Sequence, residues 1–557
     1  MENKWWKNKV VYQIYPQSFY DYQNNGIGNL KGIIQKLDYL KKLGIEMVWI
    51  SSFYKSPMVD NGYDVSDYYA INSQYGSIAD FEDLINEAKK RNIHILLDLV
   101  VNHCSDQHEW FQKALKDPLG FYGDYFIIKK GTGSRPPNNW RGIFGGSVWE
   151  PIEGTDLYYY HTFTKEQPDL NWENKNLRNE IYKIINFWLE KGIAGFRLDA
   201  ISFIKKNPSY ESFNADRPDG LVALRTVSIN YPGIEVFLKE LKEKTFDRFN
   251  AFTVAEMSAL KPESFSKFIG NEGLFTSVFD FGFMNADLKN STLWYKHNSF
   301  SALDVALPLF KSQEAAQQCD GSLAIALENH DQPRSLNKWF GSTTFSFEQA
   351  AFLAVLNLSL RGIPFLFQGQ EIGMTNVDWD TVSEIRDAKS LSQYEQAITD
   401  GIDPREAFKA IAYRSRDNAR SPMQWNDQPY AGFSKNMPWT KVNSNYQSIN
   451  VQKQESDPDS LLSFYKALIQ LRCKSKYSRV FTEGSLVQIF KDKQNLIAFE
   501  RIYQTQKIHV LLNYSNNDEK IVCDKKPFYV LGNYRSMLYE KDILRLRPFE
   551  ALIFEVF

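Results

Sequence analysis

The sequence predicts a closed (β/α)8 barrel of the TIM type, with a small domain inserted after the third strand and an antiparallel β domain at the carboxyl end. Three observations support this fold class. Apolar runs of strand length alternate with amphipathic helical segments, which is typical of a parallel sheet. The alternation continues through eight strands, which favours a closed barrel over an open doubly wound sheet. Long irregular stretches interrupt it, and these predict insertions.

The first part of the barrel is predicted in residues 1–103. Three apolar runs bounded by turn residues indicate its strands: 10–15, 47–50 and 93–101. Amphipathic helices are expected over 30–43, where Gly44 is the stop signal, and over 79–91. No Gly-x-Gly-x-x-Gly motif follows the first strand, which argues against a dinucleotide-binding fold.

The segment 104–172 breaks the alternation. It is rich in Gly, Pro, Trp and Tyr, as in the run GTGSRPPNNW at 131–140. A long irregular insert in a compact domain is usually functional. We therefore predict a small inserted domain that stands over the mouth of the barrel.

The second part of the barrel is predicted in residues 173–480. Helical periodicity returns over 177–190. Five more apolar runs complete the set of strands: 195–199, 252–257, 277–283, 323–327 and 363–367. We expect a second irregular excursion over about 372–437 and a closing helix over 459–472.

The carboxyl end, residues 481–557, has a different pattern. Short runs of alternating apolar and polar residues occur there, such as 508–512 and 551–557. This period is typical of strands with one buried face. We predict a separate β-sandwich domain.

Composition indicates a neutral substrate. The chain has 65 basic and 67 acidic residues and a net charge of −2, so no strong field attracts nucleic acid or anionic lipid. Aromatic residues make up 15% of the chain, which suits the stacking of sugar rings but is weak support alone. The cysteines have no metal-ligand spacing and are expected to be free thiols: Cys104, Cys319, Cys473 and Cys523.

The amino-terminal run MENKWW lacks the apolar core of a secretion signal. No stretch approaches 18 unbroken apolar residues, the length that a membrane helix needs. We expect a soluble, cytoplasmic protein. A near-neutral surface is compatible with a monomer.

Charged and polar residues stand at the carboxyl ends of four predicted strands. They occur in the runs DLVVNH (98–103), GFRLDAI (195–201), FTVAE (252–256) and ENHD (328–331). Active sites of parallel barrels are assembled at this end of the strands. Arg197, two residues before Asp199 on the same strand face, predicts a paired and ionised carboxylate. A structural ion pair would explain one such motif, but four strand ends together favour catalysis.

These four runs resemble the signature regions of glycoside hydrolase family 13, the α-amylase family, and the likeness extends from about Trp6 to the carboxyl terminus. Two further runs, QPDLNW at 167–172 and SRDNARSPMQW at 415–425, are similar to the oligo-1,6-glucosidase and α-glucosidase branch. That branch also includes dextran glucosidases, trehalose-6-phosphate hydrolases and sucrose isomerases. The resemblance implies the barrel predicted above, with the family's domain B as the insert.

The resemblance implies Asp199 as nucleophile, Glu256 as acid/base and Asp331 as a third carboxylate that grips sugar hydroxyls. Retaining glycoside hydrolysis needs a nucleophilic carboxylate and a proton-donating carboxylic acid roughly 5 Å apart. Arg197 is expected to hold Asp199 ionised, and the apolar surroundings of Glu256 to keep it protonated.

The run GYDVSDY at 62–68 follows the second strand. By resemblance, Tyr63 stacks on the terminal glucose and Asp64 binds the O4 and O6 hydroxyls of that sugar. Arg416 is then expected to pair with Asp64 and close the far end of the pocket, which gives exo-action. By composition alone, the run is equally an ordinary turn.

Two histidines, His103 and His330, are implied as hydrogen-bonding partners of the same sugar ring. A lone histidine is more often structural, so the neighbouring motifs carry this assignment. Gln167 and Phe144 are further candidates for the pocket wall, with simple packing as the equal alternative.

A calcium site is expected to be weak or absent. The run DYQNNGIGN at 21–29 stands where the family has its calcium loop, but only Asp21 keeps a charge, and hard cations need anionic oxygen. No other cofactor is implied, because carboxylates alone can carry out the reaction.

The residue after the nucleophile bears on linkage. Relatives devoted to α-1,6 bonds usually carry Val there, whereas this chain has Ala200, which makes space on the aglycone side and predicts relaxed linkage preference. The run DQPR at 331–334 is typical of the hydrolases. The Arg-Leu-Asp-Arg-Asp run of the sucrose isomerases is absent after Phe283.

We therefore expect a retaining, exo-acting α-glucosidase that cuts α-1,6- and also α-1,4-linked glucose from short oligosaccharides such as isomaltose. Trehalose-6-phosphate hydrolysis is an alternative, with Lys296 and Lys311 as available cations, and so is activity on sucrose, including isomerisation. A binding or transporter-associated homologue is the alternative from another class. Such members usually have broken carboxylates and an added membrane segment, and this chain has neither.

Overall fold

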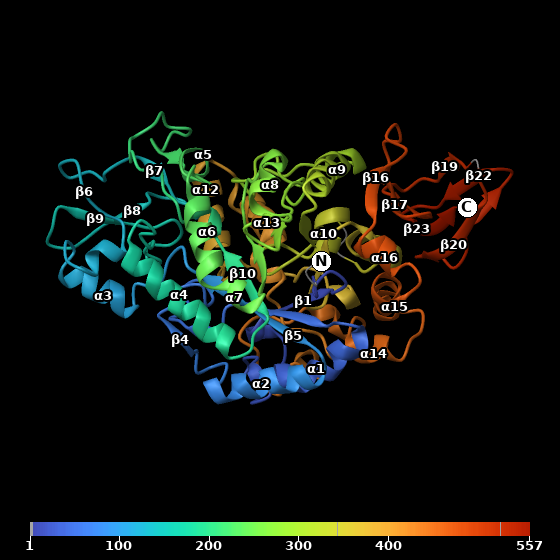
Figure 1. Ribbon diagram of the computed structural model, residues 1–557, viewed down its shortest axis with the longest axis horizontal. Coiled ribbons are helices and arrows are strands. Elements are labelled where there is room, and N and C mark those ends of the chain that lie inside the picture. Colours follow the sequence, from blue (N-terminus) through green and yellow to red (C-terminus); the bar gives the residue numbers. More distant parts are fainter. Residues whose placement is uncertain (1–3, 342–343, 524, 557) are drawn as a thin grey trace.

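The fold is built on a closed barrel of parallel strands, which confirms the predicted fold class (Figure 1). The structure is a computed structural model that describes residues 4–341, 344–523 and 525–556. Within them, eight strands form the barrel: β1 (Val11–Ile14), β2 (Met47–Ile50), β5 (His94–Val100), β10 (Gly195–Asp199), β12 (Phe252–Ala255), β13 (Ser277–Phe279), β14 (Ser322–Ala326) and β15 (Ile363–Phe367). Val11 of β1 lies opposite Phe365 of β15, where the barrel closes.

Helices cover the outside of the first strands. They are α1 (Leu30–Leu43), α2 (Ile78–Lys90) and α4 (Lys175–Glu190), each within two residues of its predicted bounds. α1 begins where the Asn29 side chain accepts the N–H of Gly32, and it ends at Gly44, whose φ of 98° suits glycine. α2 begins with a reciprocal capping box between Ser77 and Asp80.

The later helices continue the outer layer: α6 (Ile234–Lys244), α7 (Phe246–Phe249), α8 (Phe265–Phe268), α9 (Ala302–Gln318), α10 (Ser335–Phe340), α11 (Phe347–Ser359), α14 (Val451–Glu455), α15 (Leu461–Lys474) and α16 (Ser478–Thr482). The short helix α5 (Leu224–Val227) lies instead in the connection after β10. α15 packs against α1 and α11, so the predicted closing helix returns the chain to the start of the barrel. α11 is buried around its whole circumference, because α15 and the carboxyl-terminal domain cover its outer side.

The barrel interior is apolar at one end and charged at the other. Trp49, Phe279 and Phe365 pack together inside it, with ring centroids 5.9 and 6.2 Å from that of Trp49. Parallel register places Arg197 of β10 level with Asp98 of β5. The strands thus present their polar residues to one another at the carboxyl end of the barrel.

The segment after β5 forms a small, largely irregular layer, which lies at the left of Figure 1. It contains α3 (Glu109–Lys116) and an antiparallel sheet of β6 (Ile128–Lys130), β8 (Trp149–Pro151) and β9 (Leu157–Tyr160). β7 (Trp140–Arg141) pairs instead with β11 (Val222–Ala223). The connection after β10 is therefore tied to this layer, a pairing that the sequence pattern did not indicate. A short hairpin of β3 (Tyr54–Lys55) and β4 (Asp67–Ile71) follows β2.

The predicted irregular excursion over 372–437 is partly wrong, because it contains two helices, α12 (Ala388–Thr399) and α13 (Pro404–Arg414). Asp387 and Asp403 cap them by accepting backbone N–H groups of the first turn. Their apolar residues are few and pack into a small separate cluster with Trp379. The narrow apolar stripe is the reason why the sequence pattern did not reveal them.

The carboxyl-terminal domain is antiparallel, as predicted, and lies at the opposite end of the molecule from the inserted layer (Figure 1). One sheet has the strand order β16 (Ser485–Gln488), β17 (Leu496–Tyr503), β18 (Gln506–Asn513), β23 (Ala551–Val556), β20 (Pro527–Gly532). A second contains β19 (Glu519–Val522), β22 (Ile543–Leu546) and β21 (Leu538–Glu540). Apolar side chains from both sheets, such as Leu511 and Leu544, form one core.

Two predictions extend to residues outside the described ranges. Residues 1–3 belong to the amino-terminal run that was considered for a secretion signal, and residue 557 ends the predicted 551–557 strand. Among the helices of the described ranges, none combines the length and the apolar character needed to cross a bilayer.

Candidate active site

A cavity of about 70 Å³ opens at the carboxyl end of the barrel strands. Asp199 ends β10, Glu256 directly follows β12, and Asp331 lies in the loop after β14. Fourteen residues line the cavity: Asp60, Tyr63, His103, Ile143, Phe144, Phe163, Asp199, Ala200, Phe203, Arg225, Glu256, Ser258, Asp331 and Arg416. The structure thus brings the three carboxylates predicted as catalytic into one cavity.

Arg197 lies beneath this cavity and binds three carboxylates. Its Nη1 donates to Asp98 Oδ1 and Asp199 Oδ1, both at 2.7 Å, and its Nη2 donates to Glu256 Oε2 at 2.6 Å. The side chain is 3% exposed. Because two atoms of one guanidinium hold Asp199 and Glu256, these two carboxyl groups are a close, fixed pair.

The pair shares its electrostatic environment. Burial raises the pKa of both Asp199 and Glu256, and it outweighs the charge of Arg197, which lowers both. The negative charge of Glu256 raises the pKa of Asp199 further. Two carboxyl groups coupled in this way favour a state that holds one proton between them. Arg197 contacts both, so it does not by itself decide which one is ionised, and that division stays a prediction.

Asp331 is held ionised by two arginines and lies beside a histidine. Its Oδ1 accepts from Arg416 Nη1 at 2.9 Å and Arg420 Nη2 at 3.2 Å, and its Oδ2 lies 3.3 Å from His330 Nε2. Burial alone would raise the pKa of Asp331, but the surrounding positive charges hold it well below its usual range. A carboxylate fixed as an anion can accept hydrogen bonds from sugar hydroxyls.

The predicted pairing of Arg416 with Asp64 is wrong. Arg416 instead contacts Asp60 at 3.2 Å, Asp331 at 2.9 Å and Asp387 at 2.5 Å. Asp60 lines the cavity, and burial raises its pKa to about 6 despite the lowering effect of Arg416. Asp60, and not Asp64, is therefore the residue that pairs with Arg416 at the cavity.

Asp64 is buried and turned away from the cavity. Its carboxylate accepts the N–H groups of Val59 and Asp60 and the hydroxyl of Ser56. These bonds hold a tight turn in which Asn61 and Gly62 both have positive φ. The turn directs Asp60 and Tyr63 toward the cavity, so the role of Asp64 is structural. The available signal for Asp60 was its position two residues before the run at 62–68.

Tyr63 and His103 line the cavity, whereas His330 is buried behind Tyr63. The Tyr63 hydroxyl lies 2.9 Å from Asp98 Oδ2 and 2.7 Å from His330 Nε2. The Tyr63 and His330 rings are stacked, 5.4 Å apart. Burial lowers the pKa of His103 to about 4 and of His330 to about 3, so both histidines are neutral near pH 7. His330 thus acts on the site through Tyr63 and Asp331.

Gln167 and Phe144 have different positions. Phe144 is part of the cavity wall, and its ring lies 5.2 Å from the guanidinium carbon of Arg416. Gln167 is fully buried behind the wall, where its Nε2 lies 3.3 Å from Asp60 Oδ2 and 3.1 Å from His103 Nε2. Gln167 therefore orients two wall residues and is not a wall residue itself.

Ala200 lines the cavity next to the nucleophile candidate. Its φ of 45° and ψ of 26° are left-handed, which is unusual for a residue with a Cβ atom. Its N–H donates to Glu256 Oε2 at 3.3 Å. The sharp turn after β10 thus connects the backbone of one catalytic strand to the carboxylate of the next.

Several wall residues carried no sequence signal. Phe163 and Ile143 come from the inserted layer, and Phe203 from the turn after β10. Apolar residues in irregular segments show no period, so only the tertiary structure reveals them. Arg420 had a signal, because it lies four residues after Arg416 in the same run.

An outer cavity of about 530 Å³ adjoins the inner one and shares Phe144, Arg225, Glu256 and Asp331 with it. Its walls include the inserted layer, the connection after β10, the segment after β13 and α12. Contacts of α12 with the inserted layer close its side, since Lys389 donates to the carbonyl of Ile143 and Ser392 to that of Phe144. A substrate larger than one sugar would extend into this space.

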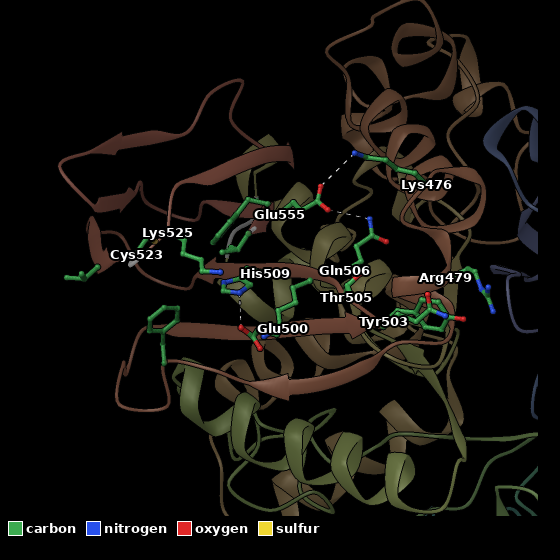
Figure 2. Close-up of a pocket in the computed structure, with 16 residues that line it drawn as sticks. Lys476, Arg479, Glu500, Tyr503, Thr505, Gln506, His509, Cys523, Lys525 and Glu555 are labelled. Atoms are coloured by element: carbon green, nitrogen blue, oxygen red, sulfur yellow. Dashed lines mark hydrogen bonds and ion pairs between the residues drawn. The ribbon is translucent and has the colours of Figure 1, made fainter.

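A larger cavity, about 1000 Å³, lies in the carboxyl-terminal domain and is shown in Figure 2. Its carboxylates are already engaged, because Glu555 contacts Lys476 and the Tyr477 hydroxyl, and Glu500 lies 2.8 Å from His509. It has none of the three carboxylates predicted as catalytic. We therefore assign the active site to the smaller cavity in the barrel.

The loop at 21–29 does not fit a calcium ion well. Asp21 Oδ2 accepts from the N–H of Gly26 and the hydroxyl of Ser434, both at 2.7 Å. Asn25 and Asn29 also use their side-chain oxygens to accept backbone N–H groups. Among the side-chain oxygens of this loop, only Asp21 Oδ1 is buried without a hydrogen-bond partner. Across the described residues, no group of three His, Cys, Asp or Glu side chains is arranged to hold a metal.

A (β/α)8 barrel with a coupled carboxyl pair at the ends of its strands defines the chain as a glycoside hydrolase. The chain belongs to the alpha-amylase family: the family's catalytic-domain model matches residues 13–482.

Relatives place the chain in the oligo-1,6-glucosidase branch. An oligo-1,6-glucosidase of Bacillus cereus is 38% identical, with all of both chains covered. Among solved structures, the trehalose-6-phosphate hydrolase of Bacillus licheniformis is 35% identical, with a TM-score of 0.92 and full coverage of both chains. The trehalulose synthase of Pseudomonas mesoacidophila MX-45 is 33% identical, with a TM-score of 0.93 and the same coverage.

Proposed function

We propose that the protein is a retaining, exo-acting α-glucosidase that removes single glucose units from the non-reducing ends of short α-glucosides such as isomaltose. The observation that supports this most is the small size of the catalytic cavity, about 70 Å³. Arg416, held by Asp60 and Asp387, is a fixed part of its wall. A sugar chain cannot pass through such a pocket, so one terminal residue enters at a time.

In the proposed reaction, Glu256 protonates the glycosidic oxygen while Asp199 attacks the anomeric carbon and forms a glycosyl-enzyme. Glu256 then takes a proton from water, which attacks the same carbon and releases glucose with retained configuration. Asp331, fixed as an anion by Arg416 and Arg420, is proposed to bind sugar hydroxyls. The reaction requires no metal or other cofactor.

The linkage preference is proposed to be relaxed. Ala200 stands where a larger residue would narrow the cavity toward the aglycone, and its small side chain leaves that space open. We propose cleavage of α-1,6 and also α-1,4 bonds. A cytoplasmic location and a monomeric state stay predictions.

A matched panel tests this proposal. Isomaltose, maltose, sucrose, trehalose and trehalose-6-phosphate are incubated with the enzyme, and the anomer of the released glucose is followed by NMR. Cleavage of isomaltose and maltose with α-glucose appearing first supports the proposal. β-Glucose appearing first would refute retention, and conversion of sucrose to an isomer would refute the hydrolase assignment.

The Asp199→Asn variant tests whether Asp199 is the nucleophile. We expect kcat to fall at least about 1,000-fold, because an amide cannot form the glycosyl-enzyme. Unchanged turnover in this variant would rule out the proposed nucleophile.

A further inference from the structure

The outer cavity contains positive charge that the hydrolysis of a neutral glucoside does not need. Arg217, Arg225 and Lys389 line it, and we call these three residues the cationic cluster. Arg217 and Arg225 lie in the connection after β10, and Lys389 lies in the first turn of α12. Segments more than 150 residues apart in the chain therefore bring this charge together.

Other cations around the outer cavity have carboxylate partners. Arg141 binds Asp216 and Asp219, and Arg414 binds Asp287. Their charge is compensated within the protein, so they supply structure and little attraction for a ligand.

The cationic cluster is different. Arg217 donates to the Thr292 hydroxyl at 2.8 Å, and Lys389 donates to the carbonyl of Ile143, but both of these partners are neutral. The negative charge of Glu256 acts on Arg225 and raises its pKa, but the two side chains form no hydrogen bond. Among the described residues, no carboxylate is close enough to form an ion pair with Arg225 or Lys389. Arg217 is partly balanced by the charges of Asp216, Asp219 and Asp400, which act on it without a hydrogen bond.

The three charges also lie close to one another. Burial, followed by the positive charges of Arg225, Arg416 and Arg217, lowers the pKa of Lys389 to about 7, and the negative charge of Asp387 opposes this only in part. Like charges that are buried close together and incompletely balanced destabilise a fold unless a ligand uses them. The Nζ atom of Lys389 also lies over the aromatic rings of Phe144 and Trp294, at 5.6 and 5.9 Å from the ring centroids.

The acidic residues that line the outer cavity do not neutralise the cluster. Glu256 is bound by Arg197, and Asp331 by Arg416 and Arg420. Asp304 caps α9 by accepting from Ser301. Among the described residues of the cavity wall, no carboxylate is therefore paired with Arg225 or Lys389, and these two cations can contact an anion from outside the chain.

We propose that the cationic cluster binds an anionic group on the aglycone sugar, such as a phosphate or a carboxylate, so that the enzyme prefers anionic α-glucosides to neutral ones. This inference rests on the proposed function, because it names the substrate class of the same site. Arg225 borders both cavities, which places the anion about one sugar away from the cleaved bond. The forked arginine groups and the lysine supply the donors that phosphate and carboxylate accept.

The lysines considered in the sequence analysis are not part of this arrangement. Lys311 pairs with Glu263 at 2.7 Å and is 63% exposed, and Lys296 does not line the outer cavity. Lys311 is therefore a matched control, because it is a lysine of the same charge outside the proposed site.

The test compares kcat/KM for neutral and anionic substrates of one skeleton. Trehalose and trehalose-6-phosphate form the phosphate arm, and maltose and its analogue with a glucuronate aglycone form the carboxylate arm. We expect the wild-type enzyme to prefer the anionic member of at least one arm by about 10-fold or more, through a lower KM. The arm that shows the preference identifies the anion. Equal values in both arms would overturn the inference.

Variants then locate the preference. Lys389→Met and Arg225→Met are each expected to reduce the anionic-to-neutral ratio of kcat/KM about 10-fold, whereas Lys389→Arg keeps most of it and Lys311→Met leaves it unchanged. Added inorganic phosphate should inhibit the wild-type enzyme competitively and the Lys389→Met variant less. A ratio that stays the same in both methionine variants would overturn the inference.

One further substrate separates this inference from the function on which it rests. The neutral aryl glucoside p-nitrophenyl α-glucoside reports glucosidase activity without any sugar in the outer cavity. Hydrolysis of this compound with no anionic preference would refute only the cationic cluster as a binding site. Lack of hydrolysis of every α-glucoside would refute the proposed function itself.

Discussion

At the scale of single residues, one guanidinium organises the catalytic charges. Arg197 contacts Asp98, Asp199 and Glu256, and burial raises the pKa of the last two, which favours one proton held between them. Buried carboxylates gathered on one cation are costly to assemble. The arrangement is useful because the reaction needs one acid and one base side by side.

The pH dependence of the reaction should report this proton. Loss of the proton from Glu256 sets the alkaline limb of kcat/KM, and the negative charge of Asp331 is one of the causes that raise the Glu256 pKa. In the Asp331→Asn variant this charge is gone, so the Glu256 pKa falls and the alkaline limb should move to lower pH. The measurement is kcat/KM against pH on p-nitrophenyl α-glucoside. A limb that stays in place or moves to higher pH would contradict the assignment of Glu256 as the acid.

Asp60 and Asp64 provide a paired test of the corrected site. Asp60→Asn should lower kcat/KM about 100-fold with Tm changed by only a few degrees, because Asp60 faces the cavity and Arg416 keeps its other partners. Asp64→Ala should instead destabilise the fold by about 2 kcal/mol, because the buried carboxylate is lost and three donors of the turn lose their acceptor. Thermal unfolding and steady-state kinetics on both variants distinguish these effects. If Asp64→Ala lowered kcat/KM and Asp60→Asn lowered the stability instead, Asp64 would be the sugar-binding residue.

At the scale of elements, the ends of the strands decide what the site can do. The turn after β10 forces Ala200 into a left-handed conformation directly beside Asp199. A residue with a Cβ atom is strained there, and a β-branched residue more so. The position therefore combines local strain with control over the space toward the aglycone.

Substitution of Ala200 should separate these two effects. Ala200→Gly should stabilise the fold by roughly 0.5–1 kcal/mol, since glycine tolerates positive φ. Ala200→Val should destabilise it and should raise the ratio of isomaltose to maltose cleavage, because the larger side chain narrows the aglycone side. Tm and kcat/KM on both disaccharides are the measurements. An unchanged ratio in the Val variant would mean that this residue does not govern linkage.

At the scale of the whole molecule, the carboxyl-terminal domain is joined to the barrel by buried polar contacts. Arg501 of β17 donates to the carbonyls of Ser359, Phe481 and Gly484, and it is fully buried. These contacts connect α11, α16 and the first sheet of the domain. The domain therefore stabilises the barrel although it lies far from the catalytic cavity (Figure 1).

Replacement of Arg501 tests this connection. Arg501→Met removes the donor to four carbonyls, those of Ser359, Phe481, Gly484 and Ser485, so we expect a loss of about 2–4 kcal/mol of stability and a lower Tm. The catalytic cavity is not contacted by Arg501, so kcat at a temperature below unfolding should stay within about 2-fold. A variant with wild-type Tm would show that the contacts contribute little.

The sequence by itself determined the barrel, the irregular insert, the antiparallel carboxyl-terminal domain and the positions of Asp199, Glu256 and Asp331. These features follow from local periodicity and from the rule that parallel strands present their carboxyl ends together. Only the tertiary structure decided that Asp60 rather than Asp64 meets Arg416, that Gln167 lies behind the wall, and that α12 brings Lys389 to Arg225. Such pairings depend on turn geometry and on contacts between distant segments, and neither leaves a periodic trace in the chain.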